Sequence, residues 1–64
     1  MADYTVTVRY DDAGSATDLA MTITAGSPEE SFIKDGDTYR FVANNGNVYV
    51  FPEASLISVK FIES

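Results

Sequence analysis

A strict alternation of side-chain type near the start of the chain constrains the fold more than any other feature. Between residues 3 and 10, every second side chain is large and apolar, and the side chains between them are polar or charged. The apolar set is Tyr4, Val6, Val8 and Tyr10, and the polar set is Asp3, Thr5, Thr7 and Arg9. A period of two with β-branched and aromatic residues is typical of a strand that is buried on one face only. The first segment is therefore predicted to be a half-buried strand.

A second alternation follows the first after a short polar segment. Leu19, Met21 and Ile23 are separated by alanine and threonine, which again predicts a strand with one apolar face. The segment between the two alternations, residues 11–15, contains two aspartates and a glycine and is typical of a turn or short loop. We expect the two strands to pair in antiparallel orientation across it.

Residues 27–34 permit two interpretations. Ser27 with Pro28 and Glu30 fits a helix-capping box, from which about two turns of helix could start. Alternatively residues 30–34 form a short strand, which a type I′ turn at Asp35-Gly36 would pair with the next segment. We favour the strand because that turn places Lys34 opposite Asp37 and Phe32 opposite Tyr39, and both pairs are complementary.

The clearest turn signal lies between residues 39–43 and 48–51, two strand-like runs separated by Asn44-Asn45-Gly46-Asn47. Asn-Gly supplies the positive φ angles of a two-residue hairpin loop. A loop at Asn45-Gly46 fixes the pairs on both faces of the hairpin. The core face would then pair Phe41 with Val50 and Ala43 with Val48, and the outer face would pair Val42 with Tyr49 and Arg40 with Phe51.

The remaining segment completes an all-β pattern. Pro52 ends the preceding strand, residues 52–55 suit one turn of 3₁₀ helix, and Ile57, Val59 and Phe61 alternate in a final strand. We therefore expect one domain over residues 1–64, a small antiparallel barrel of five or six strands with room for one short helix or 3₁₀ turn. The order of elements resembles SH3-like and Sm-like small barrels. The proline-binding aromatics of SH3 domains and the Sm signature are absent, so this resemblance implies an architecture and no function.

Composition narrows the function. The chain has no cysteine and no histidine, so it lacks disulfides and the commonest general base. The paired acidic residues lie in predicted turns and lack the spacing of a calcium loop. We expect no enzymatic activity, no catalytic residues, no metal and no cofactor. Since no apolar run approaches about 20 residues, we also expect a cytoplasmic protein without a membrane partner.

Two surfaces are candidates for binding. The preferred one consists of the outward residues of the second hairpin, namely Arg40, Val42, Tyr49 and Phe51, which would dock on another protein or on a second copy of the chain. The alternative uses a formal net charge of −6. Here the acidic residues would imitate the phosphates of nucleic acid and so inhibit a partner that binds nucleic acid. Those residues are Asp11, Asp12, Asp35 and Asp37.

Two further expectations follow from the same features. With four basic residues against ten acidic ones, we do not expect direct binding to nucleic acid. The third function class is a structural subunit of a symmetric assembly, which would use the same outer face or an open strand edge. Short, acidic, cysteine-free barrels are similar in style to accessory proteins of phages and mobile elements, including antagonists of host defence, which act inside the host cell.

Overall fold

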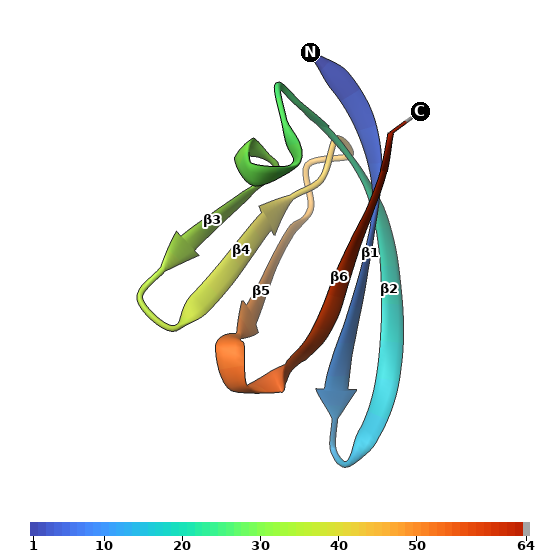
Figure 1. Cartoon of the computed structure of the whole chain (residues 1–64). Coiled ribbons are helices and arrows are strands. Elements are labelled where there is room, and N and C mark those ends of the chain that lie inside the picture. Colours follow the sequence, from blue (N-terminus) through green and yellow to red (C-terminus); the bar gives the residue numbers. More distant parts are fainter. Residues whose placement is uncertain (64) are drawn as a thin grey trace.

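The computed structural model describes residues 1–63, and these residues form six strands and two short 3₁₀ turns without an α-helix (Figure 1). The predicted all-β class is confirmed. The elements in chain order are β1 (Ala2–Asp12), β2 (Ser15–Ala25), η1 (Pro28–Glu30), β3 (Phe32–Asp35), β4 (Thr38–Val42), β5 (Val48–Pro52), η2 (Glu53–Ser55) and β6 (Leu56–Glu63).

The strands form two sheets of three, with the orders β2-β1-β6 and β3-β4-β5, and every neighbouring pair is antiparallel. The sheets face each other, and no ladder joins a strand of one sheet to a strand of the other within residues 1–63. A closed barrel requires hydrogen-bonded neighbours all the way round. The six strands agree with the sequence prediction, whereas the expected closure into a barrel is not confirmed.

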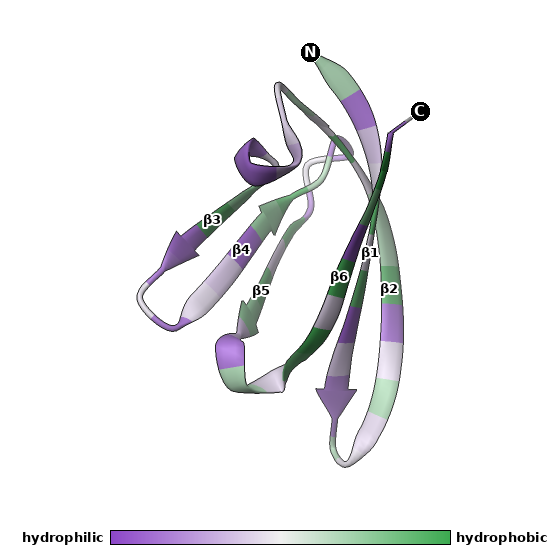
Figure 2. Ribbon diagram, in the orientation of Figure 1, coloured by the Kyte–Doolittle hydropathy of each residue, from purple (hydrophilic) through white to green (hydrophobic). Residues whose placement is uncertain are grey.

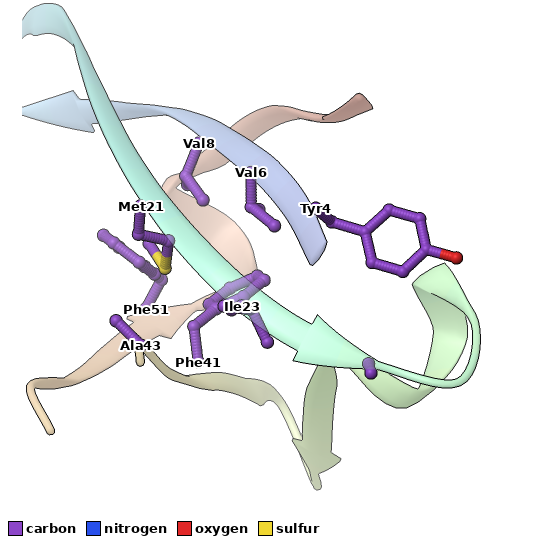
Figure 3. Close-up of a cluster of buried hydrophobic side chains, with 9 residues drawn as sticks. Tyr4, Val6, Val8, Met21, Ile23, Phe41, Ala43 and Phe51 are labelled. Atoms are coloured by element: carbon purple, nitrogen blue, oxygen red, sulfur yellow. The ribbon is translucent and has the colours of Figure 1, made fainter. Parts of the chain in front are cut away.

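The core lies between the inner faces of the two sheets (Figure 3). Val6 and Val8 of β1 are fully buried, and Phe41 of β4 is 1% exposed. The other buried apolar residues are Tyr4, Met21, Ile23, Ala25, Ala43 and Phe51. The alternation in β1 therefore assigns its faces correctly, because Tyr4, Val6 and Val8 all point inward.

The first hairpin has the predicted pairing. Asp12 pairs with Ser15, which leaves Ala13 and Gly14 as a two-residue loop, and Val6 pairs with Met21 on the inner face. Both loop residues have positive φ, 54° at Ala13 and 89° at Gly14, as a type I′ turn requires. Ala13 is the one non-glycine residue with positive φ among the described residues.

The second predicted hairpin, β4–β5, exists, but its predicted register is wrong by one residue. The Ala43 N–H donates to the Asn47 carbonyl at 2.9 Å, so the loop has three residues, Asn44 to Gly46, and not two. Gly46, at φ 90°, takes the left-handed position that completes such a loop after a turn. Consequently Phe41 pairs with Tyr49, and Arg40 pairs with Val50. Because a one-residue shift turns every side chain of a strand to the other face, Val50 lies outside and Phe51 inside.

The segment at residues 27–34 combines parts of both interpretations. Pro28–Glu30 form a single 3₁₀ turn whose Ser27 makes no side-chain cap, and a strand then starts at Phe32. Its predicted register is also wrong, by two residues, because Gly36 and Asp37 form the loop between the paired residues Asp35 and Thr38. Lys34 lies opposite Tyr39, and Phe32 lies opposite Phe41. A shift of two residues preserves the faces, so Phe32 still points toward the core.

The last strand contains an irregularity that the sequence pattern does not reveal. The predicted 3₁₀ turn before it is confirmed as η2. Arg9 pairs with Ser58, but Tyr10 pairs with Leu56, which leaves Ile57 without an opposite residue. At this bulge Ile57 is 56% exposed, although Val59 and Phe61 face inward as expected.

Candidate interaction surfaces

The outer face of the β3–β4–β5 sheet carries a group of aliphatic side chains around one cation, with the pair Asp35 and Thr38 at its end. Arg40 lies in its centre, with Ile33 opposite on β3 and Val50 opposite on β5. Val42 and Val48 form the next pair along the strands. The four aliphatic residues are about half exposed, namely Ile33 at 50%, Val42 at 47%, Val48 at 54% and Val50 at 56%. We call these four residues and Arg40 the aliphatic face.

Only half of the predicted partner-binding set lies on this face. Arg40 and Val42 point outward, as the sequence predicted, whereas Phe51 is 8% exposed and Tyr49 is half-buried against the core. The Phe51 ring lies 5.0 Å from the ring of Tyr10 between centroids, so it is part of the interior. The correct outward residues of β5 are Val48 and Val50. Once the loop length is known, the same alternation identifies them.

The opposite sheet has a different exterior. The outer face of β2-β1-β6 carries threonines together with charged residues, and the Arg9 Nε lies 3.1 Å from the Asp18 Oδ1. Its large exposed aliphatic residue is Ile62, at 49%. Two sheets of equal strand number therefore present one polar and one aliphatic exterior.

The predicted acidic residues lie at one end of the molecule. Asp11 and Asp12 end β1, and Asp35 ends β3 just before Asp37 in the turn. Figure 1 shows the β1–β2 turn at the bottom of the view and the β3–β4 turn at the left, on separate sheets. Glu53 joins this end, because its N–H donates to the Asp37 carbonyl at 2.7 Å. Of the residues that the structure describes, none of these carboxylates forms an ion pair.

One lateral side of the sandwich holds an apolar groove of about 430 Å³ between β6 and the inner face of β3 and β4. The Phe32 and Phe61 rings stack across it at 6.1 Å between centroids. Figure 2 shows hydrophobic residues along β6, in contrast to the hydrophilic ends of β1 and β3. The groove is lined by Phe32, Tyr39, Phe41, Glu53, Leu56, Ile57, Ser58, Val59 and Phe61. We call this the unbridged side, because no hydrogen bond joins β3 to β6 within residues 1–63.

The other lateral side is joined by Asn44. Its backbone N–H donates to the Thr22 carbonyl of β2 at 2.9 Å. Its side-chain Oδ1 accepts from the Thr24 N–H at 3.0 Å, and its Nδ2 donates to the Thr24 Oγ1 at 2.8 Å. Asn44 therefore occupies the edge of β2 much as one residue of a neighbouring strand would. We call this the bridged side.

The termini of β1 and β6 form an acidic end near η1. Burial raises the pKa of Tyr4 above its ordinary value of 10.0, and the nearby carboxylates of Glu63, Glu29 and Glu30 raise it further. Tyr4 is 6% exposed and pairs with Glu63 across the sheet. Figure 3 shows the Tyr4 side chain directed toward η1, which contains Glu29 and Glu30.

Neither the described structure nor the comparisons with known proteins assigns a chemical activity to this chain. Within residues 1–63 no group of three or more acidic side chains is arranged to hold a metal ion. None of the described helical segments has the length and hydropathy to cross a bilayer. No protein-family model, curated protein or solved structure matches this chain. The function is therefore argued from the two outer faces, from the end of the molecule that holds Asp11, Asp12, Asp35 and Asp37, and from the groove.

Proposed function

We propose that the protein is a non-enzymatic interaction module whose aliphatic face docks on another protein. The observation that supports this most is the contrast between the two exteriors. Four half-exposed aliphatic side chains surround Arg40, whereas the other sheet presents threonines and an ion pair. Grouped exposed apolar residues mark interaction sites, and arginine is enriched in the centre of such sites.

Arg40 defines the chemistry of the partner. The structure gives its guanidinium no ion pair or side-chain hydrogen bond with another described residue. A partner that covers the aliphatic face must therefore supply an acceptor for it, because burying an unpaired charge is costly. We infer a partner surface of apolar side chains around a carboxylate or several carbonyl groups.

The test adds negative charge to the aliphatic face in one variant and to the outer face of the other sheet in a second variant. The double variant Val48→Glu, Val50→Glu alters two half-exposed residues, so the fold should persist. Thr5→Glu with Thr22→Glu adds the same charge to the outer face of β1 and β2. Two measurements compare the variants, namely mass in solution and binding to a purified partner protein. The valine pair should change both, and the threonine pair should leave both unchanged. Equal behaviour of both variants would refute the proposal.

A second candidate is the acidic inhibitor, in which Asp11, Asp12, Asp35 and Asp37 imitate phosphates. It is supported by the position of both aspartate pairs at one end, with Glu53 beside them and no cation paired to any of them among residues 1–63. Replacing the four aspartates with asparagine should then weaken binding to a partner that binds nucleic acid. Added salt should do the same, because exposed charges are screened within about 10 Å at 0.1 M. Binding that ignores both changes would exclude this candidate.

Three finer expectations belong to the same proposal. They are an intracellular site of action, a role as an accessory protein of a phage or mobile element, and a barrel-like closure of the two sheets. The last would need a further strand on the unbridged side.

A further inference from the structure

The free edge of β6 lies directly beside the apolar groove. β6 ends the order β2-β1-β6, so within residues 1–63 its second edge has no neighbouring strand. Alternate residues of an edge strand direct their backbone N–H and C=O groups away from the sheet, where they can pair with an added strand. β6 has eight residues, which is long enough for such a pairing, whereas the nearby β3 has four.

The side chains beside this edge are suited to an added strand. Val59 and Phe61 of β6 line one wall of the groove, and Phe32 and Tyr39 line the other. Since successive side chains of a strand point to opposite faces, an added strand would direct every second side chain over this aromatic surface. The volume of about 430 Å³ has room for several aliphatic side chains.

The charges around the groove favour a basic segment. Glu53 lines it near the start of β6, and Glu63 ends the strand. Glu29 and Glu30 belong to η1, toward which the side chain of Tyr4, the partner of Glu63, is directed (Figure 3). Lys34 lies close to the groove, with its Nζ 5.5 Å from the centre of the Tyr39 ring, whereas Lys60 of β6 pairs with Thr7 on the opposite face of the strand. Both ends of the edge are therefore acidic.

The same charges disfavour a second copy of the chain. An antiparallel pair of β6 strands would bring Glu63 of one copy toward Glu53 of the other. Each copy also has a formal net charge of −6. Like charges brought together at an interface cost affinity.

We propose that the edge of β6 binds an extended segment of a partner protein that has apolar side chains at alternate positions and lysine or arginine at its two ends. The added strand would pair with β6, bury its apolar side chains in the groove and place its terminal cations near Glu53 and Glu63. Main-chain hydrogen bonds supply affinity in such complexes, and the pockets for alternate side chains supply specificity. This site is independent of the aliphatic face, which lies on the outer side of the other sheet.

The experiment uses three synthetic nine-residue peptides with threonine at every second position. The valine–lysine peptide has lysine at both ends and valine at the remaining positions, the valine–glutamate peptide has glutamate at both ends, and the serine–lysine peptide has serine in place of valine. The valine–lysine peptide should bind, and it should slow hydrogen exchange of the β6 amides in NMR spectra. The valine–glutamate peptide lacks the complementary charge, and the serine–lysine peptide lacks the apolar side chains, so each should bind at least about tenfold more weakly, a difference of about 1.4 kcal/mol.

Two variants on β6 form a matched control. Ile57 lines the groove and Ile62 lies on the opposite face, and they are 56% and 49% exposed. Ile57→Lys should weaken binding of the valine–lysine peptide about tenfold or more, whereas Ile62→Lys, with the same net charge, should change it less than about twofold.

Four results would overturn this proposal. These are no binding of the valine–lysine peptide, equal binding of the serine–lysine peptide, equal effects of the two lysine variants, and a free protein that is already a dimer with protected β6 amides. Val48→Glu with Val50→Glu separates the two sites. Peptide binding should persist in that variant, and its loss would show that the peptide occupies the aliphatic face.

Discussion

The two lateral sides of the sandwich are held together in different ways. On the bridged side, Asn44 makes three hydrogen bonds to the edge of β2. On the unbridged side, the stacked rings of Phe32 and Phe61 meet across the groove, and β3 and β6 share no hydrogen bond in the described part of the chain. One side therefore depends on directional polar contacts and the other on burial of aromatic surface.

This difference shows how a very small sandwich deals with its strand edges. An exposed edge is a template for pairing with another chain, so proteins cover or interrupt it. The Asn44 side chain covers part of the β2 edge at Thr24, and the bulge at Ile57 makes the start of β6 irregular where it pairs with β1. The rest of β6 stays open beside an apolar groove, which is why we place a partner there and not on β2.

The largest effect on stability is expected at Phe41, which packs in the core between the two lateral sides. Phe41 is 1% exposed and its ring contacts Phe32 at 5.6 Å and Phe51 at 5.9 Å between centroids. Phe41→Ala should lower the free energy of unfolding by about 3–5 kcal/mol, because it removes a packed ring from the centre. Phe32→Ala, on the partly open groove, should cost clearly less. Urea unfolding of both variants measures the difference, and equal losses would place the centre of the core in the groove.

The next effect concerns the bridged side alone. Asn44→Ala removes the two side-chain hydrogen bonds to Thr24 and keeps the backbone bond to Thr22. Since a hydrogen bond contributes about 0.5–1.5 kcal/mol and Thr24 is exposed to water, the loss should be about 1–2 kcal/mol. Asn45→Ala in the same loop is the control, because Asn45 accepts only the local Asn47 N–H. If both variants lose equal stability, the bridge adds nothing beyond the turn.

Much of the fold could be predicted from the sequence because its alternation is unbroken where burial is greatest. In β1 the side chains of Tyr4, Val6 and Val8 pack inward, as the period of two indicates. The positions of the turns follow from Gly14, Gly36 and Gly46, all with positive φ. Strand existence and order therefore depend on local signals, which a single sequence contains.

The register of the later hairpins could not be predicted from the same signals. Asn44-Asn45-Gly46 allows a two-residue loop or a three-residue loop, and the choice moves Phe51 from the outer face to the core. Asn44 favours the longer loop because its side chain then reaches Thr24, a contact with a strand that is 20 residues away. The choice is thus made by tertiary contacts, which local turn chemistry does not reveal.

The candidate surfaces were predictable only in part for the same reason. Arg40 and Val42 lie on β4, where either loop length leaves them outside, so their placement is correct. On β5 the predicted faces are reversed, because Val48 and Val50 lie outside and Tyr49 and Phe51 point toward the core. The groove is lined in part by Ile57 at the bulge and lies at the open side between the two sheets, and neither feature has a sequence signature here.

A smaller effect on stability is expected at the turns of two hairpins, β1–β2 and β4–β5. Ala13 has φ 54°, where a side chain is strained, whereas Gly46 supplies the positive φ of its own loop without strain. Ala13→Asn should raise the free energy of unfolding by about 0.5–1 kcal/mol, because asparagine tolerates this conformation and Asn-Gly suits a type I′ turn. Gly46→Ala should lower it by about 1 kcal/mol. Thermal melts decide the signs, and a loss on Ala13→Asn would contradict the type I′ assignment.

The smallest effect is a pH dependence of stability that arises at Tyr4. Burial, with Glu63, Glu29 and Glu30 nearby, raises the pKa of Tyr4 in the folded protein above 10.0, its ordinary value. The unfolded chain therefore loses this proton first as pH rises. Below pH 10 the phenol is protonated in both states, and the stability that depends on it is complete. As pH rises from about 10 toward the folded pKa, that stability is lost.

Tyr4→Phe isolates this contribution. The phenylalanine variant keeps the ring in the core and has no proton to lose, so its stability should fall less between pH 9 and 11 than that of the unmodified protein. Glu63→Gln should lie between the two, because it removes one of the carboxylates that raise the pKa of Tyr4 and leaves the burial that contributes most. Denaturant melts at closely spaced pH values measure the three slopes. Parallel curves for all three proteins would show that the Tyr4 phenol has the same pKa in the folded and the unfolded chain, and that the carboxylates near η1 lie too far from it to act on a ligand at the end of β6.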